Sequence, residues 1–131
     1  MPTASGTFEV KIAPLDPPDE AGDGNQLGRL SIDKVIHGDL EATTRGQMLS
    51  ARTTIADSAG YVAIERVTGT LQGRAGSFVL QHSGRMERGA QSLAITVVPD
   101  SGTGELLGLA GEFHLRIEAG QHFYTLEYTL P

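Results

Sequence analysis

Hydrophobic and polar residues alternate along much of the chain, most clearly between residues 60 and 86. In the second half of this stretch Phe78, Leu80 and His82 fall on one side, while the opposite side is mostly polar. A period of two is typical of a β-strand that buries one face. Two such runs flank the turn residues 72–75, so the pattern predicts a long β-hairpin.

The turn decides which residues of this hairpin face each other. Glycine in the first position of a two-residue loop suits a type II′ turn, so we place the loop at residues 73–74. This register sets Glu65 opposite His82 on the apolar face. A shift by one residue would turn the apolar side chains of one strand to the wrong face, and it is disfavoured. A shift by two keeps the faces and stays open, with His82 opposite Val67.

Alternating runs with strand character occur elsewhere in the chain. The run 40–55 is too long for one plain strand, and Gly46 predicts a bulge or bend in it. Residues 84–91 are expected to turn, and residues 105–109 to form a short strand or a helical turn. The other predicted strands cover residues 7–13, 27–37, 92–98, 112–118 and 121–130.

The closing hairpin supports the use of turns to set the register. A loop at residues 119–120 pairs Phe113 with Leu126 and Leu115 with Tyr124, so the apolar faces match. About eight short strands without a long amphipathic helix are typical of an all-β sandwich or barrel. We predict a single antiparallel β-barrel, because hairpin-linked strands that close on themselves leave no exposed edge. A barrel of about eight strands has either a filled lumen or room for one small ligand.

Composition and charge narrow the class of protein. A chain of 131 residues suffices for one domain, 1–131, in which residues 14–26 form a Pro/Gly-rich acidic loop that we expect to be mobile. A formal net charge of −6 argues against nucleic-acid and anionic-membrane partners. The absence of Cys excludes disulfides and thiol catalysis. We find neither a membrane-span pattern nor a secretory-signal pattern, and we expect a cytoplasmic protein.

Glu65 and His82 are the candidate catalytic residues, because the predicted hairpin brings a carboxylate and an imidazole together on an apolar face. A buried carboxylate must be protonated, paired or reached by water. One interpretation is a general acid–base pair that acts on a small, mostly apolar substrate. The alternative is a mutually satisfied buried pair that fixes the strand register.

Tyr61, Tyr124, Tyr128 and His122 are the candidate ligand-binding residues. The tyrosines share the inward phase of their strands, and their hydroxyls either orient a ligand or cap a polar core. His122 lies beside the last predicted turn, and therefore near a rim of the barrel. The four histidines lack zinc-motif spacing, so we expect no metal and no cofactor.

Three functions remain open for such a barrel. The first is binding of a small apolar or amphipathic molecule in the lumen. The second is an isomerase or cyclase activity that uses Glu65 and His82. The third alternative is a filled barrel that acts only through its surface. Outward-facing Val62, Ile64 and Val79 are either a contact between copies in a homo-oligomer or scattered surface residues.

Four runs of the sequence carry a family resemblance: HGDLEA (37–42), SAGYVAIERVTGTLQGRAGSFVLQHSG (58–84), VVPDSGTGELLGLAG (97–111) and HFYTLEYTL (122–130). They resemble a bacterial family of small uncharacterised proteins, the domain-of-unknown-function family 3224. The resemblance covers nearly the whole chain, and the loop around residues 17–24 departs from it by its length. It implies a calycin-like β-barrel similar to that of allene oxide cyclase, and it implies no established activity.

Overall fold

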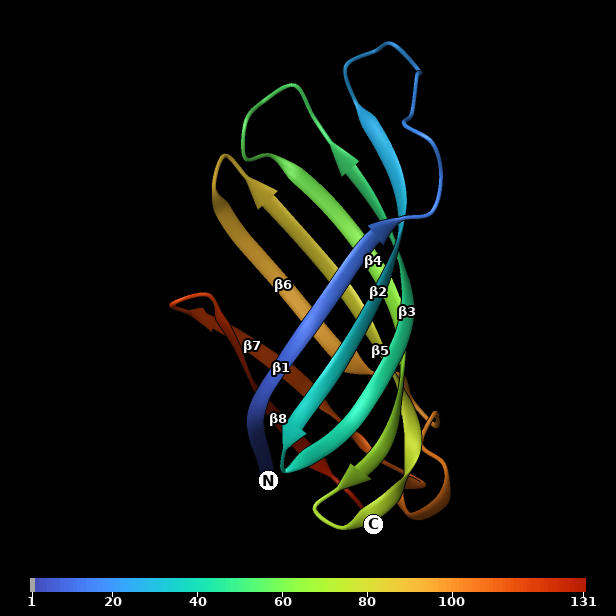
Figure 1. Cartoon of the computed structure of the whole chain (residues 1–131). Helices are drawn as coiled ribbons and strands as arrows, with labels where there is room; N and C mark the ends of the chain where they lie inside the picture. Colours follow the sequence, from blue (N-terminus) through green and yellow to red (C-terminus); the bar gives the residue numbers. More distant parts are fainter. Residues whose placement is uncertain (1) are drawn as a thin grey trace.

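The structure is a computed structural model that describes residues 2–131, and it consists almost entirely of β-strands (Figure 1). Each strand pairs antiparallel with the next, and the last pairs with the first, so the sheet closes into an eight-stranded barrel. The predicted fold class is therefore confirmed. The elements are β1 (Thr3–Pro14), β2 (Gln26–Gly38), β3 (Leu40–Arg52), β4 (Ala59–Leu71), β5 (Arg74–Glu87), β6 (Ala90–Val97), the 3₁₀ helix η1 (Gly104–Leu106), β7 (Ala110–Glu118) and β8 (Gln121–Thr129).

Three hairpins end in the same two-residue turn, in which glycine takes the second position. At Gln72 and Gly73 the φ angles are 47° and 85°, and positive φ values recur at residues 88–89 and 119–120. Positive φ at both positions defines a type I′ turn, whose twist matches that of the flanking strands. The turn predicted within residues 84–91 is formed by residues 88–89 alone, because β5 continues through Gly84 up to Glu87.

The turn at Gln72 corrects the predicted register of the central hairpin. Moving the loop one residue toward the N-terminus shifts the pairing by two, so that Glu65 faces Leu80 and His82 faces Ala63. The prediction was wrong because it placed glycine first, as a type II′ turn requires. A shift by two preserves the faces, so Glu65 and His82 still point into the barrel as diagonal neighbours. The register predicted for the closing hairpin is confirmed.

Strand β3 runs without a break through Gly46, where a bulge or bend was predicted. The irregularity at this point is a gap in the pairing of β3 with β2. A Cβ atom on Gly46 would lie 2.6 Å from the carbonyl oxygen of Ile64, so glycine allows β3 and β4 to approach closely. Beside it the β2–β3 pairing is interrupted, and the backbone N–H of Lys34 donates to Oγ1 of Thr44 at 2.9 Å. This interruption lies next to the candidate site.

The half of the lumen nearest the chain termini is filled with apolar side chains. Phe8, Leu80, Phe113 and Tyr128 are buried there among other apolar side chains. The segment between β6 and β7 folds over this end and buries Leu106 of η1. A ligand therefore has no room in this half of the barrel.

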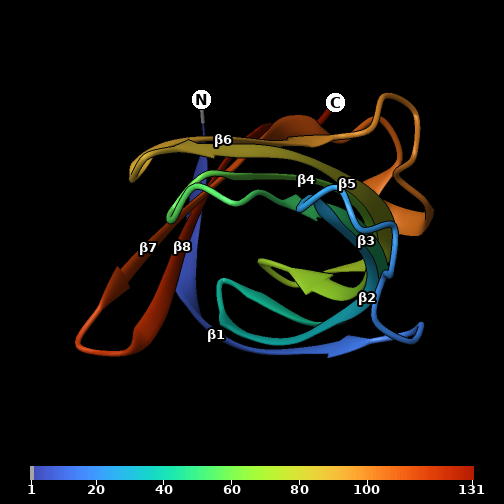
Figure 2. The same cartoon turned by 90° about the horizontal axis from the view of Figure 1, so that it is seen from above.

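The opposite half of the lumen is open at the side. Strands β6 and β7 are joined by a single residue pair, Thr96 with Glu112. Beyond that pair the β7–β8 hairpin points away from β6 (Figures 1 and 2). Ile117 near its tip continues the inward phase of Phe113 but remains 59% exposed. The closed sheet thus has one weak seam.

We expect Gly69→Ala to lower the free energy of unfolding by about 1–3 kcal/mol, because the backbone must move to accommodate a methyl group. A Cβ atom there would lie 2.1 Å from the carbonyl oxygen of Glu41. Gly60→Ala on the same strand is the control, since its nearest neighbour atom lies at 3.8 Å, and it should change stability by less than about 1 kcal/mol. Urea unfolding measures both variants, and equal midpoints would contradict the prediction.

Candidate functional site

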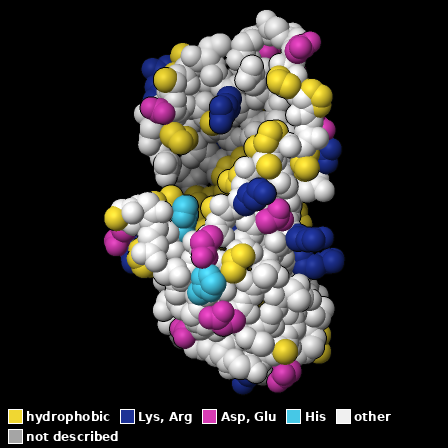
Figure 3. All heavy atoms as spheres, in the orientation of Figure 1, with side chains coloured by type: hydrophobic (Ala, Val, Ile, Leu, Met, Phe, Trp, Pro, Cys, Tyr) yellow, Lys and Arg dark blue, Asp and Glu magenta, His cyan; other side chains and the backbone are white. Residues whose placement is uncertain are grey.

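The open half of the lumen forms a cavity of about 390 Å³, which we call the cup. Figure 3 shows it as a hollow in the upper part of the molecule with hydrophobic side chains along its wall. Its volume lies in the range of small-molecule pockets. Its main wall residues are Ile12, Leu30, Met48, Tyr61, Met86 and Leu93.

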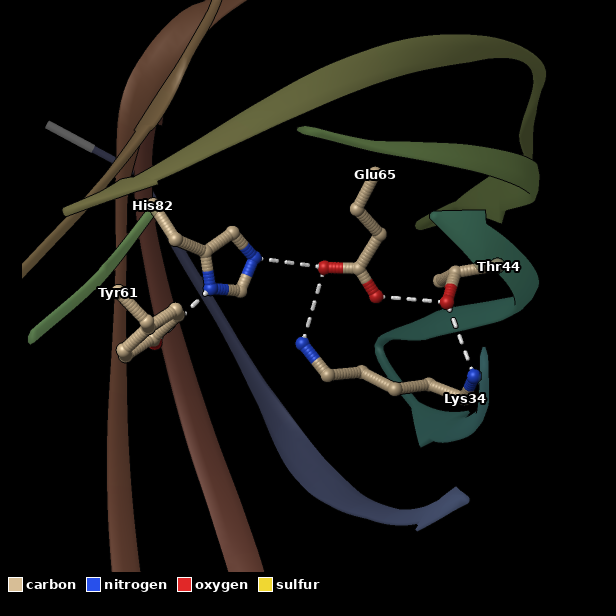
Figure 4. A network of polar contacts seen from close by, with 5 residues as sticks. All are labelled: Lys34, Thr44, Tyr61, Glu65 and His82. Atoms are coloured by element: carbon tan, nitrogen blue, oxygen red, sulfur yellow. Dashed lines mark hydrogen bonds and ion pairs between the residues drawn. The ribbon is translucent and has the colours of Figure 1, made fainter. Parts of the chain in front are cut away.

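A chain of polar side chains lies between the cup and the filled half, and we call it the ion network (Figure 4). Its centre is Glu65, which has no exposed surface. One carboxylate oxygen, Oε1, lies 3.0 Å from Nζ of Lys34 and 2.8 Å from Nε2 of His82. The other, Oε2, accepts a hydrogen bond from the hydroxyl of Thr44 at 2.6 Å. The Tyr61 hydroxyl lies 3.3 Å from Nδ1 of His82 and extends the network to the cup.

Strand periodicity places these groups inside the barrel. Lys34, Thr44, Glu65 and His82 lie on the four neighbouring strands β2 to β5, and each shares the inward phase of buried residues on its strand. Alternate side chains of a strand point to the same face, so a polar residue in the inward phase is carried into the lumen. Barrel curvature then brings the four strands together around one carboxylate.

Glu65 is held as a carboxylate by its neighbours. Burial acts to raise its pKa, but the hydrogen bond from His82, the charge of Lys34 and the hydrogen bond from Thr44 together lower it to about 2. Two hydrogen-bond donors and a cation thus outweigh the cost of desolvation. Lys34 and Glu65 carry opposite charges, so the pair adds no net charge to the interior.

The ammonium group of Lys34 is enclosed by aromatic rings as well as by the carboxylate. Its Nζ atom lies 5.1 Å from the centre of the Phe8 ring and 5.3 Å from that of Phe113. The negative faces of aromatic rings stabilise a nearby cation, and more so away from water. The filled core therefore contributes to holding the buried charge.

His82 connects the buried carboxylate to the cup. Because Glu65 can only accept at Oε1, Nε2 of His82 carries a hydrogen, and in the neutral imidazole Nδ1 is left to accept from the Tyr61 hydroxyl. Burial, and then the charge of Glu65, raise the pKa of Tyr61, so its hydroxyl stays protonated at neutral pH. The polar group offered to the cup at this depth is thus a neutral phenol.

The other sequence-predicted ligand residues lie away from the cup. The Tyr124 hydroxyl lies 3.0 Å from the backbone nitrogen of Leu40 and 3.0 Å from the carbonyl oxygen of His37, at the filled end. Tyr128 is hydrogen-bonded there to the side chain of Gln72. His122 is half-buried against Phe8, with ring centres 5.1 Å apart. The structure thus brings together Glu65, His82 and Tyr61, and separates Tyr124, Tyr128 and His122 from them.

Lys34 and Thr44 belong to the network although they were not predicted for it. Lys34 carries a recognisable signal, since it shares the phase of Ile32 and Ile36 on β2. A lysine in an otherwise apolar phase indicates a buried cation that needs an anionic partner. Thr44 carries no comparable signal, because threonine is common in strands.

The outer face of β3, β4 and β5 carries a broad groove of about 1180 Å³. Val62 and Ile64 line it and are each more than half exposed, whereas Val79 is half-buried. Contact between copies through this face stays a prediction.

Residues 2–131 contain no group of three or more His, Cys, Asp or Glu side chains arranged to hold a metal ion. No helix in this part of the chain is long and apolar enough to cross a membrane.

The fold and the site define a small antiparallel β-barrel with an open cup above a buried ion network. The chain belongs to the family described as "Protein of unknown function (DUF3224)", whose model matches residues 4–128. It is similar to a crystal structure of a DUF3224 protein with unknown function from Shewanella oneidensis MR-1, with 48% identity and a TM-score of 0.94. That match covers 100% of this chain and 98% of the other. No curated protein matches this chain.

We expect Lys34→Met and Glu65→Gln each to destabilise the protein by about 3–5 kcal/mol, because each leaves a buried charge without its partner. The double variant should cost clearly less than the sum, since neither charge remains. Urea unfolding of the four proteins gives the coupling free energy. If the losses in unfolding free energy of the two single variants simply added up in the double variant, Lys34 and Glu65 would not stabilise each other.

We also expect the stability difference between the wild type and Glu65→Gln to shrink in acid. The folded-state pKa of Glu65 is lowered from 4.5 to about 2, so its contribution is complete above about pH 4.5 and is lost as the pH falls toward 2. At about 1.4 kcal/mol per pH unit, the contribution amounts to about 3 kcal/mol. Unfolding free energies at a series of pH values from 6 to about 3 provide the measurement, and a constant difference would refute it.

Proposed function

We propose that the protein binds a small apolar or amphipathic molecule in the cup, with the polar end of the ligand toward the Tyr61 hydroxyl. The observation that carries this proposal is the pairing of an open apolar cavity with one ordered polar group connected to a buried network. Ligand pockets commonly combine apolar walls with a few fixed polar atoms.

The exposure of apolar side chains in the cup supports the proposal. Leu93 and Ile12 are 44% and 49% exposed, although both line a concave surface. A barrel that acts only through its outer surface would gain stability by filling this half as it fills the other. An apolar ligand would remove the same surface from water.

The position of Glu65 favours binding over acid–base catalysis. Glu65 has no exposed surface, is saturated by three donors, and is separated from the cup by His82 and Tyr61. A general base must reach the proton that it removes and needs a pKa near the working pH. The lowered pKa of Glu65 instead supports a structural anion that orients His82.

We expect Leu93→Trp to weaken binding of the neutral apolar dye N-phenyl-1-naphthylamine by about tenfold or more, because the indole fills part of the cup. Leu49→Trp is the matched control, since Leu49 is 56% exposed on the outer face and Leu93 is 44% exposed in the cup. Fluorescence titration measures both variants, with the circular dichroism spectrum as a check on folding. Absence of dye binding to the wild type, or equal losses in both variants, would refute the proposed function.

A further inference from the structure

We infer that the cup takes an apolar carboxylic acid, and that binding of its carboxylate is accompanied by uptake of one proton at the Tyr61–His82 pair. This inference rests on the proposed function and specifies its ligand. Three features support it: the charge balance of the ion network, the sequence of hydrogen bonds from Tyr61 through His82 to Glu65, and the charge of the residues that line the cup.

The ion network offers a ligand no free positive charge. The ammonium group of Lys34 is 3.0 Å from Glu65 and buried, so its charge is already matched. His82 is neutral when Nδ1 accepts from Tyr61. A carboxylate in the cup would therefore lie over an electroneutral floor, and uptake of one proton with it would restore the charge balance.

The order Tyr61, His82, Glu65 provides a place for that proton (Figure 4). If Nδ1 of His82 is protonated, it donates to the Tyr61 oxygen, and the Tyr61 O–H is free to donate to a ligand carboxylate. The imidazolium keeps its hydrogen bond from Nε2 to Glu65, which lies at 2.8 Å. No covalent bond other than N–H is made, and the ligand anion and the added proton cancel in charge.

The groups that face His82 allow this change of charge. Glu65 and Tyr61 approach it from β4, and Lys34 of β2 contacts the same carboxylate oxygen. On β6 the residue opposite His82 is the apolar Ile95. The Glu65 carboxylate attracts a positive charge on His82, whereas the Lys34 ammonium group on the same oxygen repels it, so these two contacts act in opposite directions.

The charged residues that line the cup favour an anion. Two arginines lie along its lining, Arg52 and Arg85, and both are exposed, in a chain whose formal net charge is −6. Arg85 alternates with the inward residues His82, Gly84 and Met86 of β5, so only Arg52 lies in the inward phase. Arg52 continues the inward phase of Met48 on β3 and lies toward the mouth. Within residues 2–131 neither arginine forms an ion pair. Positive charge at the mouth attracts a carboxylate that the rest of the molecule repels.

The test compares octanoate with its uncharged methyl ester by isothermal titration calorimetry in two buffers of different ionisation enthalpy. At pH 8 we expect uptake of about one proton per octanoate bound, and none for methyl octanoate. Octanoate affinity should rise about tenfold for each unit that the pH falls, until the free protein is itself protonated. Octanoate binding without proton uptake, or with an affinity independent of pH, would overturn the inference.

Variants locate the proton and separate this inference from the proposed function. Tyr61→Phe and His82→Gln should each abolish the proton uptake that accompanies octanoate binding. Tyr61→Phe retains the ring and leaves the hydrogen bond between His82 and Glu65 in place, so it serves if His82→Gln fails to fold. Arg52→Gln should weaken the binding of octanoate more than that of methyl octanoate. Uptake that persists in Tyr61→Phe would show that the Tyr61 hydroxyl is not needed for it and would refute the role of the pair. Absence of dye binding by the wild type would refute the proposed function itself.

Discussion

The buried carboxylate of Glu65 is the constraint around which the barrel interior is arranged. A charge with no exposed surface is tolerated only if its neighbours replace the water it has lost. Lys34, Thr44 and His82 do so from three other strands, and each is itself buried. Four neighbouring strands are thereby tied to one point in the lumen, where a displacement of any of them would leave a polar group unpaired.

The ion network also marks the boundary between two different halves of the lumen. On one side lies a filled core, whose rings Phe8 and Phe113 face the Lys34 ammonium group. On the other side lies the cup, which stays open because β6 and β7 meet at a single pair, Thr96 with Glu112. A filled barrel and a hollow barrel are therefore combined in one chain, and a ligand has access to one half only.

The ion network both specifies the packing of the strands and orients the polar group that faces the cup. Full satisfaction of Glu65 specifies the packing of β2 to β5. The same hydrogen bonds fix the tautomer of His82 and the orientation of Tyr61 at the cup. A ligand group thus meets a hydroxyl that is already ordered, and ordering costs at the moment of binding are reduced.

The sequence by itself determined the strands, their two faces and the closing hairpin, because these depend on alternation and on residues adjacent to a turn. It therefore placed Glu65 and His82 on the inward face, even though the turn at Gln72 and Gly73 shifted their pairing by two residues. Only the tertiary structure decided that Lys34, 31 residues from Glu65, would be its partner, and that the lumen would divide into a core and a cup. The reason is physical: periodicity and turn geometry act over a few residues, whereas pairing of a buried charge and the closure of a sheet depend on strands that meet only in three dimensions.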